Sequence, residues 1–531
     1  MIEISQPELP NADFCKTCAR FSSGGDRKSN ATALIKVLDR IANNLARDEE
    51  LRQRMGGEEP SIWYNLQCLW KITSAIDSSD EFGTVTNILI TSVARFTRNL
   101  VAGVPANQNL SYENEPALRQ ILYKYSSWVA TQESNSFAIT RMTVQTLSNI
   151  VTKNEDLMTR LWDTYMNLSE EQAILIRLLN SPDPKTVLST IVLIVNCAHE
   201  SRARCSMLIQ KPAGARICVT LLDRMVGLYD AEESTDEGKA FDYGYHLFAH
   251  LFDGGFTSDL YDHLTIEGEI ITPHQTTLLK LLDSHLQSSR LSTTHRQLCP
   301  MLSDRFLQFS TYAQSSILHA LESISTITTD GPLDAAAVPQ QLDLLLPKVC
   351  EAIVLVTQCI VTVTLSSVAV RNGVGQDLRS VFNQARSVRG QNIVISAIEL
   401  LRLLDKFLPR INFGKAVSPP APDKPAHFSA ATDPTGFSYL KRDLVRLLGI
   451  FCHQDKEIQD QIRVIDGIPV IMSMCVVDER NPYLREHAIL ALRNILEGNI
   501  DNQAVIDSIQ PSRSWDDEGV LRETPDAARR K

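Results

Sequence analysis

Two residue pairs in this chain have the types and spacing of metal ligands. Cys15 and Cys18 form a C-x-x-C pair, and His246 and His250 stand four residues apart, which puts both imidazoles on one face of a helix. A zinc site takes three or four such protein ligands. No further C-x-x-C pair accompanies the first, and His199 is the first histidine of the chain. We therefore predict no bound metal and no cofactor, and these two pairs are the candidates if a metal is bound.

Motifs for catalysis are missing from the sequence. It contains no G-x-x-x-x-G-K-[ST] phosphate-binding loop, no G-x-S-x-G nucleophile turn and no H-E-x-x-H zinc motif. We therefore expect a protein that is not an enzyme and that acts through binding.

Four asparagines stand in similar contexts, near the ends of apolar helical segments: Asn99, Asn149, Asn196 and Asn494. An asparagine amide offers both a donor and an acceptor, so such residues can pair with the backbone of an extended peptide in a groove. Alternatively, each asparagine bridges neighbouring helices and satisfies their backbone groups. Ile450 occupies the corresponding position in one repeat, and this interruption favours bridging.

A charged band surrounds the last of these asparagines. Arg485, Glu486, His487 and Arg493 precede Asn494 within one predicted helix. His487 and Arg493 could edge a binding groove, but a solvated helix face has the same composition. Both residues remain candidates for partner binding.

An internal repeat predicts the elements that position these residues. Leu447–Ile462 aligns with Ala491–Ile506 at an offset of 44 residues, and Gln459 falls on Gln503. The segment Arg98–Gly103 matches Arg493–Gly498 at an offset of 395 without a gap. Helical units with a period in the forties are typical of armadillo and HEAT arrays, which usually present a long surface for binding.

The predicted fold is an all-α, armadillo/HEAT-like right-handed α-solenoid. Proline and glycine clusters and charge shifts divide the chain. We predict an irregular N-terminus (1–30), N-terminal armadillo-like helical repeats (31–228), an acidic loop (229–244), a middle helical region (245–416), a proline-rich linker (417–434), a C-terminal domain of two armadillo-like repeats (435–510) and a disordered tail (511–531).

Composition narrows the choice of partner and compartment. The net charge of −11 and the lack of a long lysine or arginine run argue against nucleic acid as a partner. The first residues carry neither a basic segment nor an apolar segment of a secretory signal. Eleven scattered cysteines then indicate reduced thiols, so we expect a cytoplasmic protein.

One segment has the hydropathy of a membrane span. Ala352–Val370 has 19 residues without a charge and an average hydropathy of roughly 2 per residue. Threonine and serine interrupt it, and a central helix covered on both sides has the same composition. We favour the buried helix. The span and the two metal-ligand pairs support the alternative function, a membrane-associated or copper-handling factor.

The C-terminal residues carry a family resemblance. Gly436–Leu444, Asp466–Pro469, Asn481–Ala488 and Ala491–Asn494 resemble the C-terminal domain of the ataxin-10 family, and the rest of the chain resembles it only in repeat architecture. The resemblance implies an armadillo-like cytoplasmic protein, a fungal or otherwise divergent member, with a role in cytokinesis. Its expected partners are other proteins, bound as an extended peptide or through a helical surface. The sequence leaves the oligomeric state open.

Overall fold

The computed structural model describes most of the chain, in two units. Residues 1–264 form unit 1 and residues 265–531 form unit 2, and each is described by itself. The described residues are 10–23, 26–76, 83–288, 293–327, 343–369, 377–408, 410–412, 415–417, 437–509, 513–515 and 521–523.

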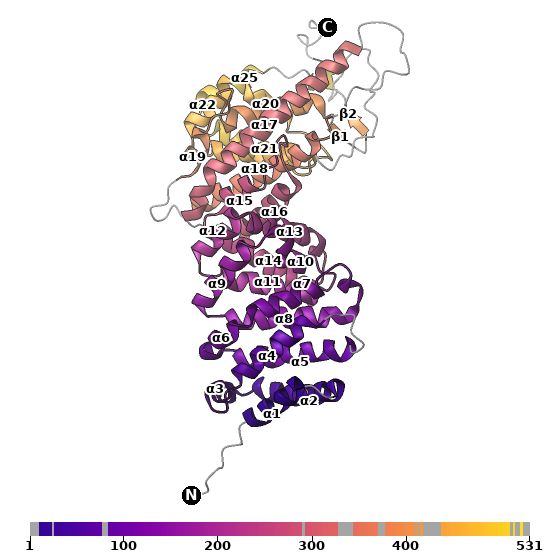
Figure 1. The fold of residues 1–531 in the computed structure, drawn as a ribbon. Coiled ribbons are helices and arrows are strands. Elements are labelled where there is room, and N and C mark those ends of the chain that lie inside the picture. The colour runs from indigo at the N-terminus through magenta and orange to yellow at the C-terminus, as the bar shows by residue number, and fades with distance from the viewer. Residues whose placement is uncertain are drawn as a thin grey trace. The chain divides into compact units, whose positions relative to one another are not determined.

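Unit 1 is built of helices, and Figure 1 shows them in indigo to magenta. They are α1 (Asn11–Ser22), α2 (Arg27–Leu45), α3 (Glu49–Gly57), α4 (Trp63–Ala75), α5 (Gly83–Val101), α6 (Pro105–Tyr112), α7 (Glu115–Tyr125), η1 (Ala130–Gln132), α8 (Ser134–Val151), α9 (Glu155–Met166), η2 (Glu170–Gln172), α10 (Ile174–Leu179), α11 (Pro184–Ala198), α12 (Arg202–Gln210), α13 (Pro212–Leu228), α14 (Asp236–Asp253) and α15 (Thr257–His263).

Five of these helices pack against one another in chain order: α2, α5, α8, α11 and α14, the stacked helices of unit 1. Their sequences are apolar at spacings of three and four residues. In α8, for example, Val144, Leu147 and Val151 are fully buried. Such a stripe makes a helix stable by burial against its neighbours rather than by its own propensity.

A left-handed residue recurs in the turn after the stacked helices. Gly103, Lys153, Glu200, Gln454 and Gly498 have φ angles between 55° and 74°. In each case a short helix begins two residues later. The shared backbone geometry indicates that the same helical unit recurs in both units of the chain.

Unit 2 is also mainly helical, with two short hairpins. Its elements are α16 (Pro273–Ser288), α17 (Thr293–Ile327), α18 (Leu346–Ala369), α19 (Arg379–Gln384), α20 (Ile393–Phe407), β1 (Arg410–Asn412), β2 (Lys415–Val417), α21 (Leu440–Cys452), α22 (Lys456–Val464), α23 (Gly467–Ser473), α24 (Leu484–Leu496), α25 (Ile500–Ser508), β3 (Arg513–Trp515) and β4 (Leu521–Glu523). The stacked helices of unit 2 are α16, α18, α21 and α24. The all-α fold class is confirmed for the chain.

The repeat offset of 44 residues is visible in the helix bounds of unit 2. α21 and α24 begin at Leu440 and Leu484, and α22 and α25 begin at Lys456 and Ile500. The residues before α21 and α24, Tyr439 and Tyr483, are both left-handed. Sequence register and backbone geometry therefore agree residue by residue.

The apolar segment Ala352–Val370 lies in α18, apart from Val370, which is outside the described residues. Residues Leu346–Ser367 are long and apolar enough to cross a membrane, but 72% of the window with this property is buried inside the protein. α18 packs against α16, α17 and α21. The core helix of a helical array has both properties.

The N-terminus is more ordered than we expected. Residues 1–30 were predicted to be irregular, but α1 covers Asn11–Ser22. Phe14, Cys18 and Phe21 form a stripe at spacings of four and three residues, and this stripe is buried. Phe14 stacks on Phe96 of α5 with ring centroids 5.0 Å apart. The two glycines that follow α1 in the sequence favoured the prediction of an irregular segment, so this short helix was missed.

The acidic loop predicted at 229–244 is shorter than expected because α14 begins at Asp236. The Thr235 side chain accepts a hydrogen bond from the Gly238 amide and caps the helix. Asp236 and Glu237 lie in the first turn, where negative charge is favoured by the helix dipole. Acidic residues that suggested a loop thus mark a helix N-terminus.

Strands appear where none was expected. β1 and β2 form an antiparallel hairpin at the end of the predicted helical region 245–416. Of the predicted linker, Val417 ends β2 and residues 418–434 lie outside the described residues. In the predicted tail, β3 pairs with β4, and the other residues after Gln510 are likewise outside.

Candidate protein-binding surface

A set of polar side chains crosses the stacked helices of unit 1. We call it the polar row, and its members are Asp39, Arg95, Arg98, Gln145, Lys185, Ser189 and Asp236. They come from α2, α5, α8, α11 and α14 in that order.

The first part of the polar row joins three helices. The Arg95 guanidinium lies 3.5 Å from the Asp39 carboxylate, and these side chains are 40% and 35% exposed. One turn further along α5, Arg98 donates to the Gln145 carbonyl oxygen at 2.7 Å. Both arginines project from the same face of α5 because they are three residues apart.

The second part continues through α11 to α14. Gln145 donates through its amide nitrogen to the Ser189 hydroxyl at 3.3 Å. Lys185 lies 3.9 Å from Asp236, and their side chains are 56% and 34% exposed. Exposed ion pairs of this length add little to stability, so these charges remain available to a partner.

Asn99 and Asn149 are used inside the array. The Asn99 amide nitrogen donates to the Ala42 carbonyl of α2 at 2.8 Å, and Asn149 donates to the Arg98 carbonyl of α5 at 3.1 Å. Asn99 is only 7% exposed. Each amide thus joins one stacked helix to the one before it, which is the bridging arrangement.

The other two asparagines act similarly. Asn494 donates to the Gly449 carbonyl of α21 at 2.8 Å. Asn196 donates to the hydroxyls of Ser148 and Thr152 of the preceding helix, at 3.2 and 3.1 Å. Each of these four amide nitrogens thus uses at least one of its two N–H donors in a bond within the array.

Glutamines in the short helices make a second kind of bridge, which we call the amide lock. Gln108 of α6 donates to the carbonyls of Asn149 and Thr152, both at 2.9 Å, where α8 ends. Its carbonyl oxygen accepts from Asn154, which caps the next short helix, α9. One side chain therefore holds three backbone or side-chain groups of the following repeat.

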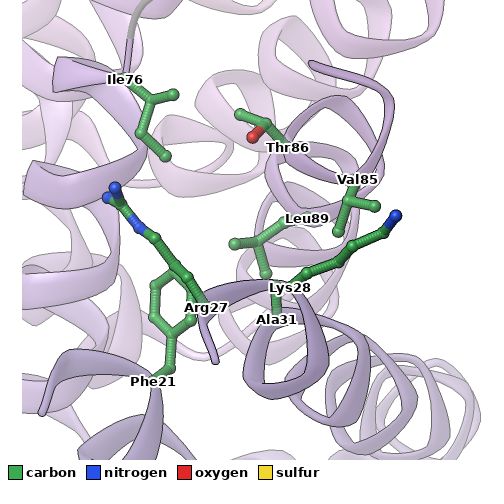
Figure 2. A pocket seen from close by; sticks show the side chains of 8 residues that line it. All are labelled: Phe21, Arg27, Lys28, Ala31, Ile76, Val85, Thr86 and Leu89. Carbon is green, nitrogen blue, oxygen red and sulfur yellow. The ribbon is translucent and has the colours of Figure 1, made fainter. Parts of the chain in front are cut away.

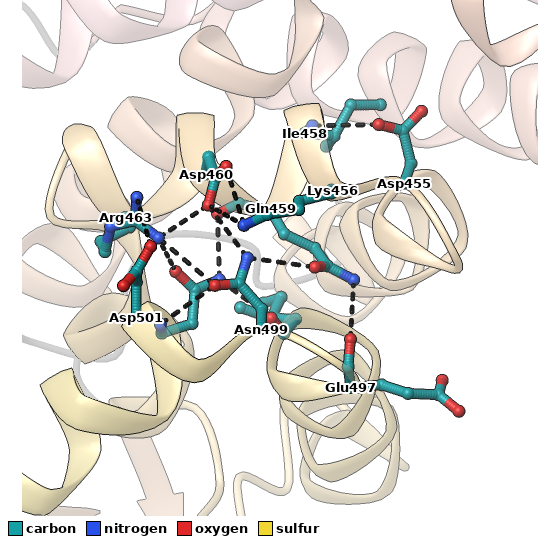
Figure 3. A network of polar contacts seen from close by, with 11 residues as sticks. Asp455, Lys456, Ile458, Gln459, Asp460, Arg463, Glu497, Asn499 and Asp501 are labelled. Atoms are coloured by element: carbon teal, nitrogen blue, oxygen red, sulfur yellow. Dashed lines mark hydrogen bonds and ion pairs between the residues drawn. The ribbon is translucent and has the colours of Figure 1, made fainter.

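The same lock recurs in unit 2, within the network drawn in Figure 3. Gln459 of α22 donates to the Asn494 carbonyl at 2.8 Å and accepts from Asn499 at 3.2 Å. Asn499 also donates to Asp460 at 2.9 Å, and Arg463 donates to Asp460 at 2.7 Å. These two hydrogen bonds lower the pKa of Asp460 to about 2.

His487 and Arg493 lie on α24, as the sequence predicted, but in different surroundings. His487 is half-buried, and its pKa is lowered by burial and by the nearby charges of Arg446 and Arg442. Arg493 is exposed. Both residues belong to unit 2, whereas the polar row belongs to unit 1.

The cavity shown in Figure 2 is small. Its volume of about 20 Å³ is roughly the space of one water molecule, whereas ligand pockets need about 300 Å³ or more. It is lined by Phe21, Arg27, Lys28, Ala31, Ile76, Val85, Thr86 and Leu89. This cavity cannot hold a substrate or a cofactor.

The candidate metal ligands make other contacts. Cys15 donates to the Ser61 carbonyl at 3.6 Å, and burial raises the pKa of Cys18 to about 12. His250 stacks on His199 at a centroid distance of 5.8 Å, and His246 is exposed. Within the described ranges, no three His, Cys, Asp or Glu side chains are grouped to hold a metal ion.

Sequence reasoning found the asparagines but missed the polar row and the amide lock. Gln459 had been aligned with Gln503 as a repeat position, and that shared position was the available signal. Arg95, Gln145 and Lys185 carry no motif. They became visible only once α2, α5, α8 and α11 were placed side by side.

Comparison with known proteins gives a family match and several partial matches to relatives. The family model for the spinocerebellar ataxia type 10 protein domain matches residues 440–525. An ataxin-10 homolog of Kluyveromyces lactis is 28% identical over 141 residues, or 22% of this chain and 26% of that protein. Ataxin-10 of Xenopus tropicalis is 41% identical over 70 residues, or 13% of this chain and 14% of that protein.

The matches are partial on both sides. The chain spans only 14–26% of the length of these two relatives. A solved structure of SYS-1 superposes with a TM-score of 0.34 at 12% identity, covering 93% of this chain and 94% of that chain. A TM-score this low does not support a fold assignment, which therefore rests on the helices of this chain itself. Over residues 440–525, the chain carries the C-terminal domain of the ataxin-10 family.

Proposed function

We propose that this chain is a cytoplasmic helical-repeat scaffold that binds other proteins and has no catalytic chemistry of its own. The observation that carries the proposal is the polar row. It crosses the five stacked helices of unit 1 and presents half-exposed charges of both signs, such as Arg95 and Asp236. Interfaces recognise partners through such patterned charges, which set specificity and association rate.

The backbone beneath the row supports this proposal. Asn99, Asn149 and Gln108 fix neighbouring helices to one another, so the row sits on a preformed surface. A preformed surface loses little conformational entropy when a partner binds. A role in cell division, through cytokinesis, follows from the family resemblance of the C-terminal domain and is part of the proposal.

Charge reversal in the polar row tests the function. We expect Arg95→Glu combined with Lys185→Glu to remove a defined set of partners from the full-length protein. Proximity labelling in cells followed by quantitative mass spectrometry measures this loss. The melting temperature must stay unchanged, since exposed ion pairs contribute about 0–1 kcal/mol each.

A matched control uses a lysine of the same unit outside the row. Lys71 of α4 is exposed, and Lys71→Glu makes the same kind of charge change. Loss of partners in the row variant alone supports binding at the row. An identical partner set in the row variant, the control and the wild type contradicts the proposed function.

A further inference from the structure

Three neighbouring stacked helices of unit 1 carry positive charge alone. α5, α8 and α11 pack in this order, and their charged residues are Arg95, Arg98, Arg141 and Lys185, without an aspartate or glutamate. The chain as a whole has the opposite balance, with 52 Lys and Arg against 63 Asp and Glu. We call these four residues the basic segment, and they form a positive region on an acidic protein.

Arg141 extends the polar row on α8. It lies four residues before Gln145, so both side chains project from one face of the helix. Lys185 and Ser189 have the same spacing on α11. Each of these two helices therefore presents a basic side chain one turn before the neutral member of the row.

Two cations of the basic segment lack a carboxylate. Arg98 donates to the side-chain oxygens of Gln145 at 2.7 Å and Asn99 at 3.1 Å, and both acceptors are neutral. Within the described ranges, neither Arg98 nor Arg141 forms an ion pair. Burial and the positive charge of Arg95 lower the pKa of Arg98. A carboxylate supplied by a partner would stabilise these charges through charge-assisted hydrogen bonds.

The helices on either side of the basic segment contribute negative charge to the row. Asp39 of α2 lies 3.5 Å from Arg95, and Asp236 of α14 lies 3.9 Å from Lys185. A nucleic-acid strand would bring phosphates against both carboxylates, so this pattern disfavours a uniform polyanion. It is complementary to a chain with acidic residues in its middle and basic residues at both ends.

The spacing of the stacked helices selects the conformation of such a chain. Packed helices lie about 8–10 Å apart. A polyproline II chain has three residues per turn and rises about 3.1 Å per residue, so every third side chain lies on one face, about 9 Å from the last. A peptide in this conformation would present one side chain to each stacked helix.

We propose that the polar row binds an extended peptide of another protein, in which acidic residues at every third position face α5, α8 and α11. Basic residues three positions further out, at both ends, face Asp39 and Asp236. This inference rests on the proposed scaffold function and adds the chemistry of its partner. Arg141 receives the middle carboxylate and is the residue that determines this specificity.

The probe is a fluorescent peptide that repeats Glu-Pro-Ser three times, between Lys-Pro-Ser and a final Lys. Its charge pattern is the same in both chain directions, so the test does not depend on the orientation of binding. We expect it to bind the full-length protein, measured by fluorescence anisotropy. Arg141→Glu should weaken binding at least about tenfold, because two carboxylates would then face each other.

The matched control is Lys71→Glu, which changes the net charge by the same amount at an exposed position of α4 outside the row. It should leave the peptide affinity unchanged. Both variants should melt at the wild-type temperature, because Lys71 is exposed and Arg141 is partly exposed. An equal loss in both variants would mean that only the overall charge attracts the peptide, and would overturn the proposal.

A charge exchange tests the pairing at Arg141. A second peptide, with lysine in place of the middle glutamate, should bind wild-type protein at least about tenfold more weakly than the first. It should bind Arg141→Glu within about threefold of the original affinity. A purely structural role of Arg141 would not produce this rescue. The absence of rescue, or of binding between the first peptide and the wild type, overturns the proposal.

Three further results overturn it by changing the spacing or the occupant. Equal affinity for a peptide of the same composition with its glutamates adjacent would exclude recognition at every third position. Tighter binding of a single-stranded DNA of the same number of units, weakened by Arg141→Glu but not by Lys71→Glu, would identify a polyanion. Conversion of an oligomer into a monomer by Arg141→Glu, measured by sedimentation, would identify a second copy of the chain.

Failure of the peptide is distinguishable from failure of the scaffold function. If Arg95→Glu combined with Lys185→Glu removes partners in cells but the peptide does not bind, the row binds proteins through other chemistry. If that variant keeps every partner, the scaffold function itself is contradicted.

Discussion

At the scale of single residues, asparagine and glutamine side chains join the repeats. Asn99, Asn149 and Asn494 each donate to a backbone carbonyl of the preceding stacked helix. Each of these carbonyls belongs to one of the last four residues of its helix, where backbone carbonyls lack regular intrahelical partners. One asparagine amide therefore links two helices without changing the geometry of either.

Asn494→Ala should lower the free energy of unfolding by about 1–2 kcal/mol, because a partly buried bond between helices is lost. Gln503→Ala, which removes an exposed amide of the same repeat, should change it by less than about 0.5 kcal/mol. Urea unfolding followed by circular dichroism compares the two. Equal values for both variants would mean that Asn494 does not bridge α21 and α24.

Asp460 makes the stability of the amide lock depend on pH. The hydrogen bonds from Asn499 and Arg463 lower its pKa from 3.8 to about 2. Because the pKa is lower in the folded state, the contribution is complete above about pH 4 and is lost as the pH falls through 2. The melting temperature of Asp460→Asn should therefore lie below that of the wild type at pH 6 and approach it near pH 2. A difference that stays constant with pH would contradict this role.

At the residue scale, the sequence indicated positions within the repeat but not the contacts made there. The spacing of Asn494 and Gln459 in the repeat could be read directly from the chain. Their acceptors could not, because Gly449 lies 45 residues from Asn494 and becomes adjacent only when two helices pack. Gly449 permits that packing, since it lies against Ala491.

At the scale of elements, the turn after each stacked helix sets the direction of the next helix. Gly103 and Gly498 supply its left-handed residue in two repeats, and Lys153, Glu200 and Gln454 do so in three others. A non-glycine residue in this conformation costs roughly 1–2 kcal/mol. Three turns adopt this conformation in spite of its cost. The packing of the helices therefore requires the turn geometry, whether or not the residue is glycine.

Gly498→Ala should destabilise the protein by about 1 kcal/mol, because alanine cannot adopt a φ of 67° without strain. The control is Gly227→Ala in α13, where a new Cβ meets nothing within 4 Å. This control should be neutral or stabilising by up to about 1 kcal/mol, as alanine favours helix. Thermal melts of both variants give the comparison. A neutral Gly498→Ala would show that the turn can relax.

At the scale of the whole chain, the family domain depends on residues that precede it. The family match begins at residue 440. Lys441 is almost fully buried and donates to the Leu408 carbonyl at 3.1 Å, and Asp443 accepts from Gln358 of α18 at 3.0 Å. Asp478 accepts from the Ile411 amide of β1 at 3.2 Å. Burial lowers the pKa of Lys441, so removal of these partners would be costly.

A fragment of residues 437–509 should therefore be poorly folded, whereas a fragment of residues 265–531 should melt cooperatively. The shorter fragment exposes the apolar face that α21 buries against α18 and α20. Circular dichroism and thermal melting of the two fragments distinguish these outcomes. A cooperative, fully helical short fragment would show that the matched domain is autonomous.

The all-helical class could be predicted from the sequence because one period recurs in several segments. The division after Leu264 could not, since α14, α15 and α16 follow one another without a proline-rich or glycine-rich linker. The hairpin of β1 and β2 was also missed, because its strands have only three residues each. Such short strands have no alternating pattern to detect.

The bridges between stacked helices also have a mechanical consequence. In unit 1, Asn99 and Asn149 lie near the C-terminal ends of α5 and α8, and Gln108 bonds to the same end of α8. The amide hydrogen bonds made by these three residues thus lie at the C-terminal ends of the helices, whereas Gln145 and Ser189 join α8 to α11 nearer their middles. Under tension, the helix ends away from these amide hydrogen bonds would separate first. Unit 1 would then extend elastically before the amide hydrogen bonds between its stacked helices break.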